Sequence, residues 1–189
     1  AIISFSGGIV FNTITISIPK IVDEGIRGDI PLAWIGSIAT AVLLFGGIAQ
    51  LTVGQLVQYF RPHILFAVIG IMQGIGVALT TVTTGYALLF ALALSIAAIY
   101  GQITVGDLVI ARYTADAWRG RIYAVRFFLT FISSGLAVAM IAALYGKGGA
   151  GLLLGTTAIF AAVFAFCTVM IALLATRVER TNLSMQPAE

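Results

Sequence analysis

Short polar gaps divide this chain into six apolar stretches, and nearly all of its charge lies in those gaps. Each stretch is about 18 to 25 residues long, which is the length that an α-helix needs to cross the hydrocarbon core of a bilayer. Charged residues make up 9% of the chain, whereas an average soluble domain has about 25%. The sequence therefore predicts an all-α membrane protein, a bundle of six transmembrane helices.

Proline, glycine and charged residues bound the predicted spans. The spans cover about residues 1–19, 32–57, 64–80, 86–110, 121–145 and 152–175, and residues 177–189 form a polar tail that we expect in the cytoplasm. Spans one to three and four to six make two triplets, with longer charged connections at comparable places. We therefore expect two three-helix repeats, and triplets that face opposite ways across the membrane are the building unit of many secondary transporters.

Arginine and lysine are distributed unequally between alternate connections. The gaps after spans two, four and six, with the start of span five, hold Arg61, Arg112, Arg119, Arg121, Arg126, Arg177 and Arg180, whereas the other gaps hold Lys20, Arg27 and Lys147. Basic connections stay in the cytoplasm. We therefore expect both ends of this segment in the cytoplasm of a bacterial inner (plasma) membrane, with Lys20–Asp29 facing outward. Topology accounts for the net charge of +3, so we expect no nucleic-acid partner.

The chain lacks the residue sets that membrane enzymes commonly need. His63 is its only histidine, in a predicted cytoplasmic turn, and Cys167 is its only cysteine, in the middle of a predicted span. Neither a serine protease site nor a zinc site can be assembled from them, and no glycine-rich phosphate loop ends in Lys-Ser or Lys-Thr. We expect no catalysis, no cofactor and no metal, and Cys167 is a small apolar filler.

Two connections resemble conserved motifs of the major facilitator superfamily. Residues 54–63, GQLVQYFRPH, resemble the turn between the second and third helices of each half of such a transporter. Gly54 and Leu56 match that motif and Arg61 supplies its basic end, while Gln58 replaces the usual aspartate. The resemblance implies that this turn lies on the cytoplasmic side.

The second motif, residues 117–124 with the sequence AWRGRIYA, resembles the Arg-Gly-Arg start of the fifth helix of a half. Arg119, Gly120 and Arg121 carry it. The resemblance covers the whole chain and implies a carboxy-terminal half, helices seven to twelve, whose partner is a missing amino-terminal six-helix half of the same chain. Such a protein moves a small solute by alternating access, and we expect a gradient of protons or another ion to drive it. The start of the chain at Ala1, inside an apolar run, agrees with this expectation.

Charged residues near the cytoplasmic end suggest a gate. Asp107 is the carboxylate expected inside a span, and an acid there needs a partner. Arg126 lies at matching depth on the fifth span, as does Arg112. We hypothesise that Asp107, Arg112, Arg126 and Arg61 pair when the inner side is closed and part when it opens. The alternative for the gate is an ion pair at the membrane interface that stays joined. The alternative for Arg119 and Arg121 is that they only fix the orientation of the chain in the membrane, beside the interfacial Trp118.

In this superfamily the first and fourth helices of each half line the central path, which implies that role for the first and fourth spans. The polar candidates are Asn12, Thr13, Thr15 and Ser17 on the first span and Tyr100, Gln102 and Thr104 on the fourth. Asn12 and Gln102 are the strongest, because an amide in hydrocarbon needs partners more than a hydroxyl that can bond to its own helix. The alternative role for each is a contact between helices.

Two other functions stay open at this point. The first is a six-span permease subunit of an ATP-driven transporter, which would need a cytoplasmic coupling helix; the connection at Ala111–Gly120 is short for one. The second is a non-transporting membrane scaffold protein, which a dry core without polar lining would favour. Because the polar residues of the expected path are mostly neutral, we do not expect it to carry a compact, multiply charged solute.

Overall fold

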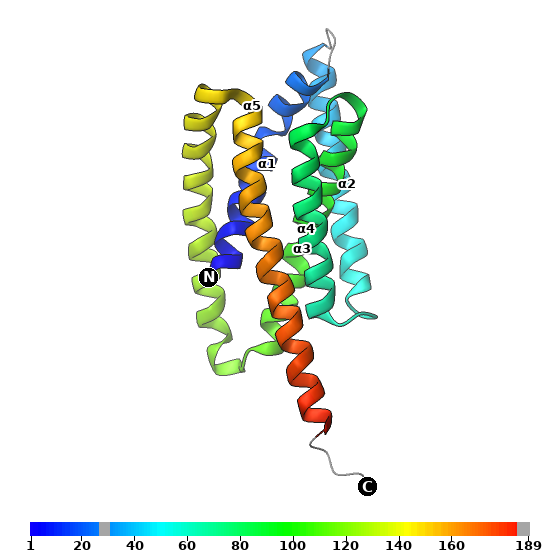
Figure 1. The fold of residues 1–189 in the computed structure, drawn as a ribbon, viewed down its shortest axis with the longest axis vertical. Helices are drawn as coiled ribbons and strands as arrows, with labels where there is room; N and C mark the ends of the chain where they lie inside the picture. Colours follow the sequence, from blue (N-terminus) through cyan, green and yellow to red (C-terminus); the bar gives the residue numbers. More distant parts are fainter. Residues whose placement is uncertain (27–30, 185–189) are drawn as a thin grey trace.

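The computed structural model describes residues 1–26 and 31–184, except for the side chains of residues 32 and 179–184. Five helices form that part of the chain (Figure 1). They are α1 (Ile2–Gly25), α2 (Leu32–Leu56), α3 (Pro62–Val82), α4 (Gly85–Tyr113) and α5 (Asp116–Ser184). The predictions that involve Arg27, Asp29, the side chain of Arg180 and residues 185–189 lie outside the described residues.

Five helices are delimited where the sequence predicts six, because α5 contains the last two predicted spans as two helical arms joined at a kink. Only Gly148 (φ −148°, ψ 17°) and Gly149 (φ 62°, ψ −159°) leave helical torsion angles inside α5. There the chain turns back, so that α5 consists of a first arm that rises and a second arm that descends in Figure 1. A positive φ of this size is the region where glycine is favoured, which explains the glycine-rich sequence at the turn.

Two short links join helices at the end of the bundle that lies lowest in Figure 1. We call this the lower end; it holds the link from α2 to α3 and the two-residue link Thr114–Ala115 from α4 to α5. The upper end holds the link from α3 to α4 and the turn at Gly148 and Gly149. The links therefore alternate between the two ends in the order in which the sequence predicts the spans.

Packing places α1 against α5, α4 and α2, while α3 lies against both α4 and α5. Ile14 and Ile18 of α1 pack with Leu92 and Ile96 of α4 in the larger apolar core. A smaller cluster brings Phe66 of α3, Val105 of α4 and Phe164 of α5 together near the lower end. The core is therefore built from helices that are distant in the sequence.

Small residues allow some of these helices to approach closely. A Cβ at Gly70 would lie 2.2 Å from Thr168 Oγ1, and one at Gly74 would lie 3.5 Å from Ala165 Cβ. The close approach of α3 to the second arm of α5 thus depends on these glycines, as expected for helices that associate in a membrane. By contrast, a Cβ at Gly155 would meet nothing within 4 Å.

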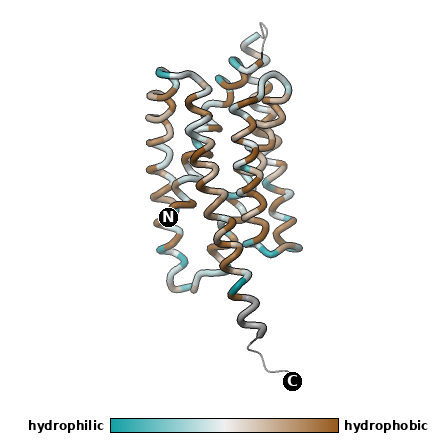
Figure 2. Tube along the Cα trace, in the orientation of Figure 1, coloured by the Kyte–Doolittle hydropathy of each residue, from teal (hydrophilic) through white to brown (hydrophobic). Residues whose placement is uncertain are grey.

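The described helices are long and apolar enough to cross a membrane. Their outward surface carries large apolar side chains: Phe45 and Leu51 on α2 and Phe131 and Phe166 on the two arms of α5 are about half exposed or more. Figure 2 shows hydrophobic residues along the helices and hydrophilic residues gathered towards the ends. Such a surface suits a bilayer rather than water, in agreement with an integral membrane protein.

Several helices continue beyond the apolar spans that the sequence predicts. Helix α1 passes through Pro19 to Gly25, and an ion pair of 3.8 Å joins Lys20 to Glu24 one turn later. Helix α5 continues through the polar segment after Thr176 as far as Ser184. Helix propensity and (i, i+4) pairs extend helices into polar sequence, so the ends of a helix need not coincide with the ends of the apolar stretch.

Candidate functional site

A pocket of about 620 Å³ lies between α1, α4 and the first arm of α5, towards the lower end. Its wall is largely apolar and includes Phe11, Phe66, Trp118, Phe127 and Phe164. The polar and charged side chains in the wall are those of Ser4, Gln102, Asp107, Arg121, Arg126 and Thr130. Ligand pockets of roughly 300–1,000 Å³ with a few polar groups in an apolar wall are the common form of small-molecule sites.

Glycine at position 7 shapes the inner part of the pocket. A Cβ there would lie 3.1 Å from the ring of Phe164 and 3.2 Å from Gln102 Oε1. The missing side chain of Gly7 lets α1 lie directly against both groups. Phe164 in turn meets Phe66 edge to face, with ring centroids 5.7 Å apart.

Gln102 is the polar group of the inner wall. Its side chain is buried, and its Oε1 has no hydrogen-bond partner among the described residues. A buried amide oxygen without a partner costs free energy, roughly 1–3 kcal/mol by mutational comparison. An unsatisfied polar group that lines a pocket is therefore a group that a ligand or water can satisfy.

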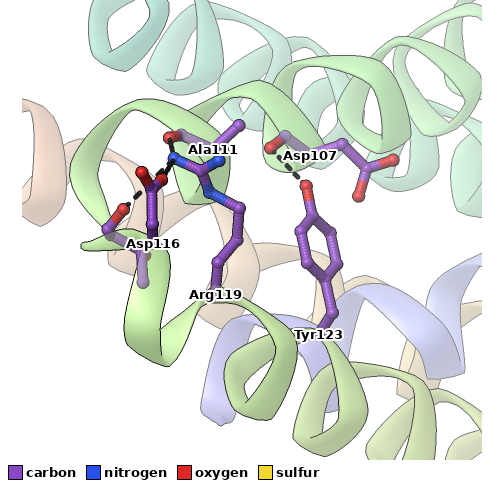
Figure 3. Close-up of polar contacts among 6 residues, drawn as sticks. Asp107, Ala111, Asp116, Arg119 and Tyr123 are labelled. Carbon is purple, nitrogen blue, oxygen red and sulfur yellow. Dashed lines mark hydrogen bonds and ion pairs between the residues drawn. The ribbon is translucent and has the colours of Figure 1, made fainter.

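An ion pair joins Asp107 of α4 to Arg126 of α5 at the wall of the same pocket. A Cβ at Gly106 would lie 3.3 Å from Arg126 Nη2, so the guanidinium rests directly on the backbone of α4. The hydroxyl of Tyr123 also donates to the backbone oxygen of Asp107 at 2.9 Å (Figure 3). Two side chains of the first arm of α5 therefore hold one residue of α4.

Arg119 connects the same two helices at their lower ends (Figure 3). Its Nη2 lies 2.9 Å from the carbonyl oxygen of Ala111 and 2.7 Å from Asp116 Oδ1. The carbonyls of a last helical turn lack partners within the helix, and a basic side chain that reaches them has a favourable interaction with the helix dipole. Arg119 therefore caps α4, a role that the sequence analysis did not predict for it.

Arg121 has a different environment. Its guanidinium lies 4.8 Å from the centre of the Trp118 ring, a cation–π contact. No carboxylate among the described residues forms an ion pair with it. Both side chains are exposed and belong to the pocket wall.

The pocket wall contains one of the seven predicted path residues, Gln102, and Thr15 is among those outside it. Asn12 donates to the backbone oxygen of Gly8 at 2.8 Å, so its amide finds a partner in its own helix. Thr13 and Ser17 are buried, and their hydroxyl oxygens have no partner among the described residues.

The remaining two candidates lie elsewhere on α4. Tyr100 packs beside Phe11, with ring centroids 6.0 Å apart. Thr104 faces α2, because its methyl group lies 3.9 Å from where a Cβ of Gly54 would be. The helical spacing of polar residues thus did not reveal which of them share one cavity.

The predicted gate residues are also divided. Asp107 and Arg126 meet in the ion pair, Arg112 lies exposed in the last turn of α4, and Arg61 is the N-cap residue of α3. Neither Arg61 nor Arg112 lines the pocket. Of the motif residues, Leu56 ends α2, and Gly120 has open space around it.

His63 lies in the first turn of α3 rather than in a turn between helices, and it is fully buried. Its Nδ1 is 3.0 Å from the hydroxyl of Tyr113, and its Nε2 is 3.5 Å from Oγ1 of Thr176. The ring therefore joins α3, α4 and the second arm of α5 at the lower end. The sequence signal for this contact was only the lone histidine after Pro62.

The described residues hold no cluster of three or more His, Cys, Asp or Glu side chains that could bind a metal ion. No family model, curated protein or solved structure matches this chain. The resemblance to the major facilitator superfamily therefore depends on the sequence of the two motifs and stays a prediction.

Proposed function

We propose that this chain is one half of a secondary transporter of the major facilitator type, which moves a small solute across the membrane by alternating access. The pocket between α1, α4 and the first arm of α5 would be its share of the solute path. The ion pair of Asp107 and Arg126 would act as a barrier at the lower end of that path. A gradient of protons or of another ion would supply the energy, and a second six-helix half of the same protein would complete the path.

The observation that supports this proposal most is the pocket with the unsatisfied Gln102 in its wall. A bundle that only filled the membrane would gain from packing this space, since each unfilled volume in a core costs free energy. The ion pair joins two helices beside this pocket. In the proposal it has two states, one in which the two side chains are paired and one in which they are apart. Pocket and ion pair together are the parts that a gated path requires.

The proposed orientation follows from the basic residues. The lower end carries Arg61, Arg112, Arg121 and Arg177, and we assign it to the cytoplasm by the positive-inside rule. The link at Thr114–Ala115 would then be cytoplasmic and the turn at Gly148 and Gly149 external. A bacterial inner membrane is the proposed location.

The permease alternative receives less support than the transporter. Helix α4 ends at Tyr113 and α5 begins at Asp116, so the link between them has no room for a coupling helix. The scaffold alternative predicts a dry core without polar lining. The pocket wall instead contains charged groups and an amide, so it does not favour a scaffold.

Site-directed labelling of the intact membrane protein tests alternating access without knowledge of the solute. In a Cys167→Ala background, Ser4→Cys places one thiol in the pocket wall, and a membrane-impermeant maleimide is applied to oriented vesicles from each side in turn. Alternating access predicts labelling from both sides, while labelling from one side alone, or from neither, would contradict it. Thr114→Cys and Thr83→Cys serve as one-sided controls, and Leu44→Cys, on the exposed apolar face of α2, should stay unlabelled.

A further inference from the structure

Within the proposed solute path, the charges of the pocket wall are unbalanced. The wall contains one carboxylate, that of Asp107, and the guanidinium groups of Arg121 and Arg126. Because Asp107 pairs with Arg126, the charge of Arg121 is left without a described carboxylate partner. The mouth of the pocket is thus electropositive by about one charge, and an anion is the ligand that it favours.

The interior of the same pocket excludes a strongly polar ligand. Phe11, Phe66 and Phe164 form much of the inner wall. The hydroxyl of Thr130 is already used, since it donates to the backbone oxygen of Arg126 at 3.0 Å. A ligand with many hydroxyl groups would leave most of them unsatisfied here, at a cost for each.

The polar groups are arranged along the helix axes. Gln102 precedes Asp107 on α4 by a little more than one turn, or roughly 7–8 Å at a rise of about 1.5 Å per residue. Arg121 precedes Arg126 on α5 by the same number of residues. With the ion pair parted, a ligand can therefore reach from Arg121 at the mouth to the amide of Gln102 at the inner wall.

We propose that the pocket binds a monoanionic amphiphile, with its acid group at Arg121 and its apolar or aromatic body against the inner phenylalanines. This inference rests on the proposed function and gives the class of solute that the path would carry. A phosphate of a membrane lipid and a carboxylate of a free solute share this chemistry. Cation–π contact with Trp118 keeps the guanidinium of Arg121 at the mouth, where either group would meet it.

Trp118 offers a direct reporter of occupancy, because the chain has only two tryptophans and the other, Trp34, lies on α2. The intact protein with Trp34→Phe and Cys167→Ala, and with any tryptophan outside this chain also replaced, is placed in phosphatidylcholine nanodiscs. The probe is 2-bromo-5-phenylbenzoate, whose bromine lies beside the carboxylate and quenches tryptophan fluorescence on contact. The uncharged 2-bromo-5-phenylbenzamide is the matched control ligand.

We expect saturable quenching by the anion, with an affinity at least about tenfold higher than that of the amide. Arg121→Gln should weaken binding of the anion by about tenfold or more, as the loss of one charge-assisted contact does, and should leave the amide unchanged. Arg121→Lys should retain most of the binding. Lys147→Gln removes the same charge at the opposite end of the first arm and should have no effect.

Ser4→Phe distinguishes the pocket from a basic surface, because it narrows the pocket and leaves Arg121 in place. It should weaken saturable quenching clearly; an unchanged affinity would contradict a ligand body inside the pocket. Equal affinity for anion and amide, or an unchanged affinity in Arg121→Gln, would overturn the proposal. Phosphatidylglycerol in the nanodiscs competes with the probe if the natural ligand is a lipid and does not compete if it is a free solute. Labelling of Ser4→Cys is independent of these readouts, so failure of the ligand class and failure of alternating access are distinguishable.

Discussion

The guanidinium of Arg119 lies 2.9 Å from the carbonyl oxygen of Ala111, so a side chain in the first turn of α5 caps the last turn of α4. With only Thr114 and Ala115 between the two helices, this contact fixes the angle at which α5 leaves the lower end. The ion pair of Asp107 and Arg126 lies on the same two helices. The cap therefore helps to hold together α4 and α5, the two helices that contribute the ion pair to the pocket wall.

Removal of the cap should destabilise the protein more than removal of its exposed ion-pair partner. Arg119→Ala loses charge-assisted hydrogen bonds, and because Arg119 is 41% exposed we expect a loss of about 1–2 kcal/mol in the free energy of unfolding. Asp116 is 89% exposed, so Asp116→Asn should cost less than about 0.5 kcal/mol. Unfolding in mixed detergent micelles measures both, and equal effects would exclude the capping role.

The close approach of α3 to α5 makes Gly70 sensitive to a single methyl group. Gly70→Ala places a Cβ against Thr168, whose side chain must move, and overpacking of this kind costs about 1–3 kcal/mol. Gly155→Ala is the matched control: it lies in the second arm of α5 with nothing within 4 Å, so it should be neutral or stabilise by about 0.5–1 kcal/mol. The same unfolding measurement decides, and tolerance of Gly70→Ala would show that the helices are less tightly packed than described.

Loss of the ion pair should open the lower end of the pocket. In the Ser4→Cys, Cys167→Ala protein, Asp107→Asn should raise the rate of maleimide labelling from the lower side several-fold, because Arg126 no longer holds α4 to α5. The charge swap Asp107→Arg with Arg126→Asp should return the rate towards its original value. Asp116→Asn is the control for a neutralised acid outside the pocket, and an unchanged rate in Asp107→Asn would favour the static ion pair.

The proposed topology makes a simple prediction for reagents that reach one side of the membrane. Cysteines at Thr114 and Thr83 should react from opposite sides, with Thr114 on the cytoplasmic side. Both links join helices that cross the bundle. Reaction of Thr114→Cys from outside an intact cell would reverse the orientation inferred from the arginines.

The sequence could predict those features that depend on one helix at a time. The glycines after Tyr145 mark the turn inside α5. The start of α3 was less well predicted, since Pro62 and His63 were expected in the connection and belong to the helix. A depth argument along two adjacent spans named both Arg126 and Arg112 as partners of Asp107, and the structure joins Asp107 to Arg126.

The pocket could not be predicted in the same way, because it depends on helices far apart in the chain. Phe66 and Phe164 meet at its inner wall only when α3 and the second arm of α5 pack together. Asn12 shows the converse: its amide suggested a path residue, but the backbone of its own helix satisfies it. Polar residue type therefore identified candidates, and only the packing separated Gln102 from the others.

Distance distributions between two spin labels measure the proposed gate most directly. In the intact protein with Cys167→Ala, labels at Arg112→Cys on α4 and Phe128→Cys on α5 lie on either side of the ion pair, at exposed positions. Double electron–electron resonance should resolve two distances, for the joined and parted states of Asp107 and Arg126, and Asp107→Asn should shift the population towards the longer one. A single distance that Asp107→Asn leaves unchanged would contradict a gate between α4 and α5.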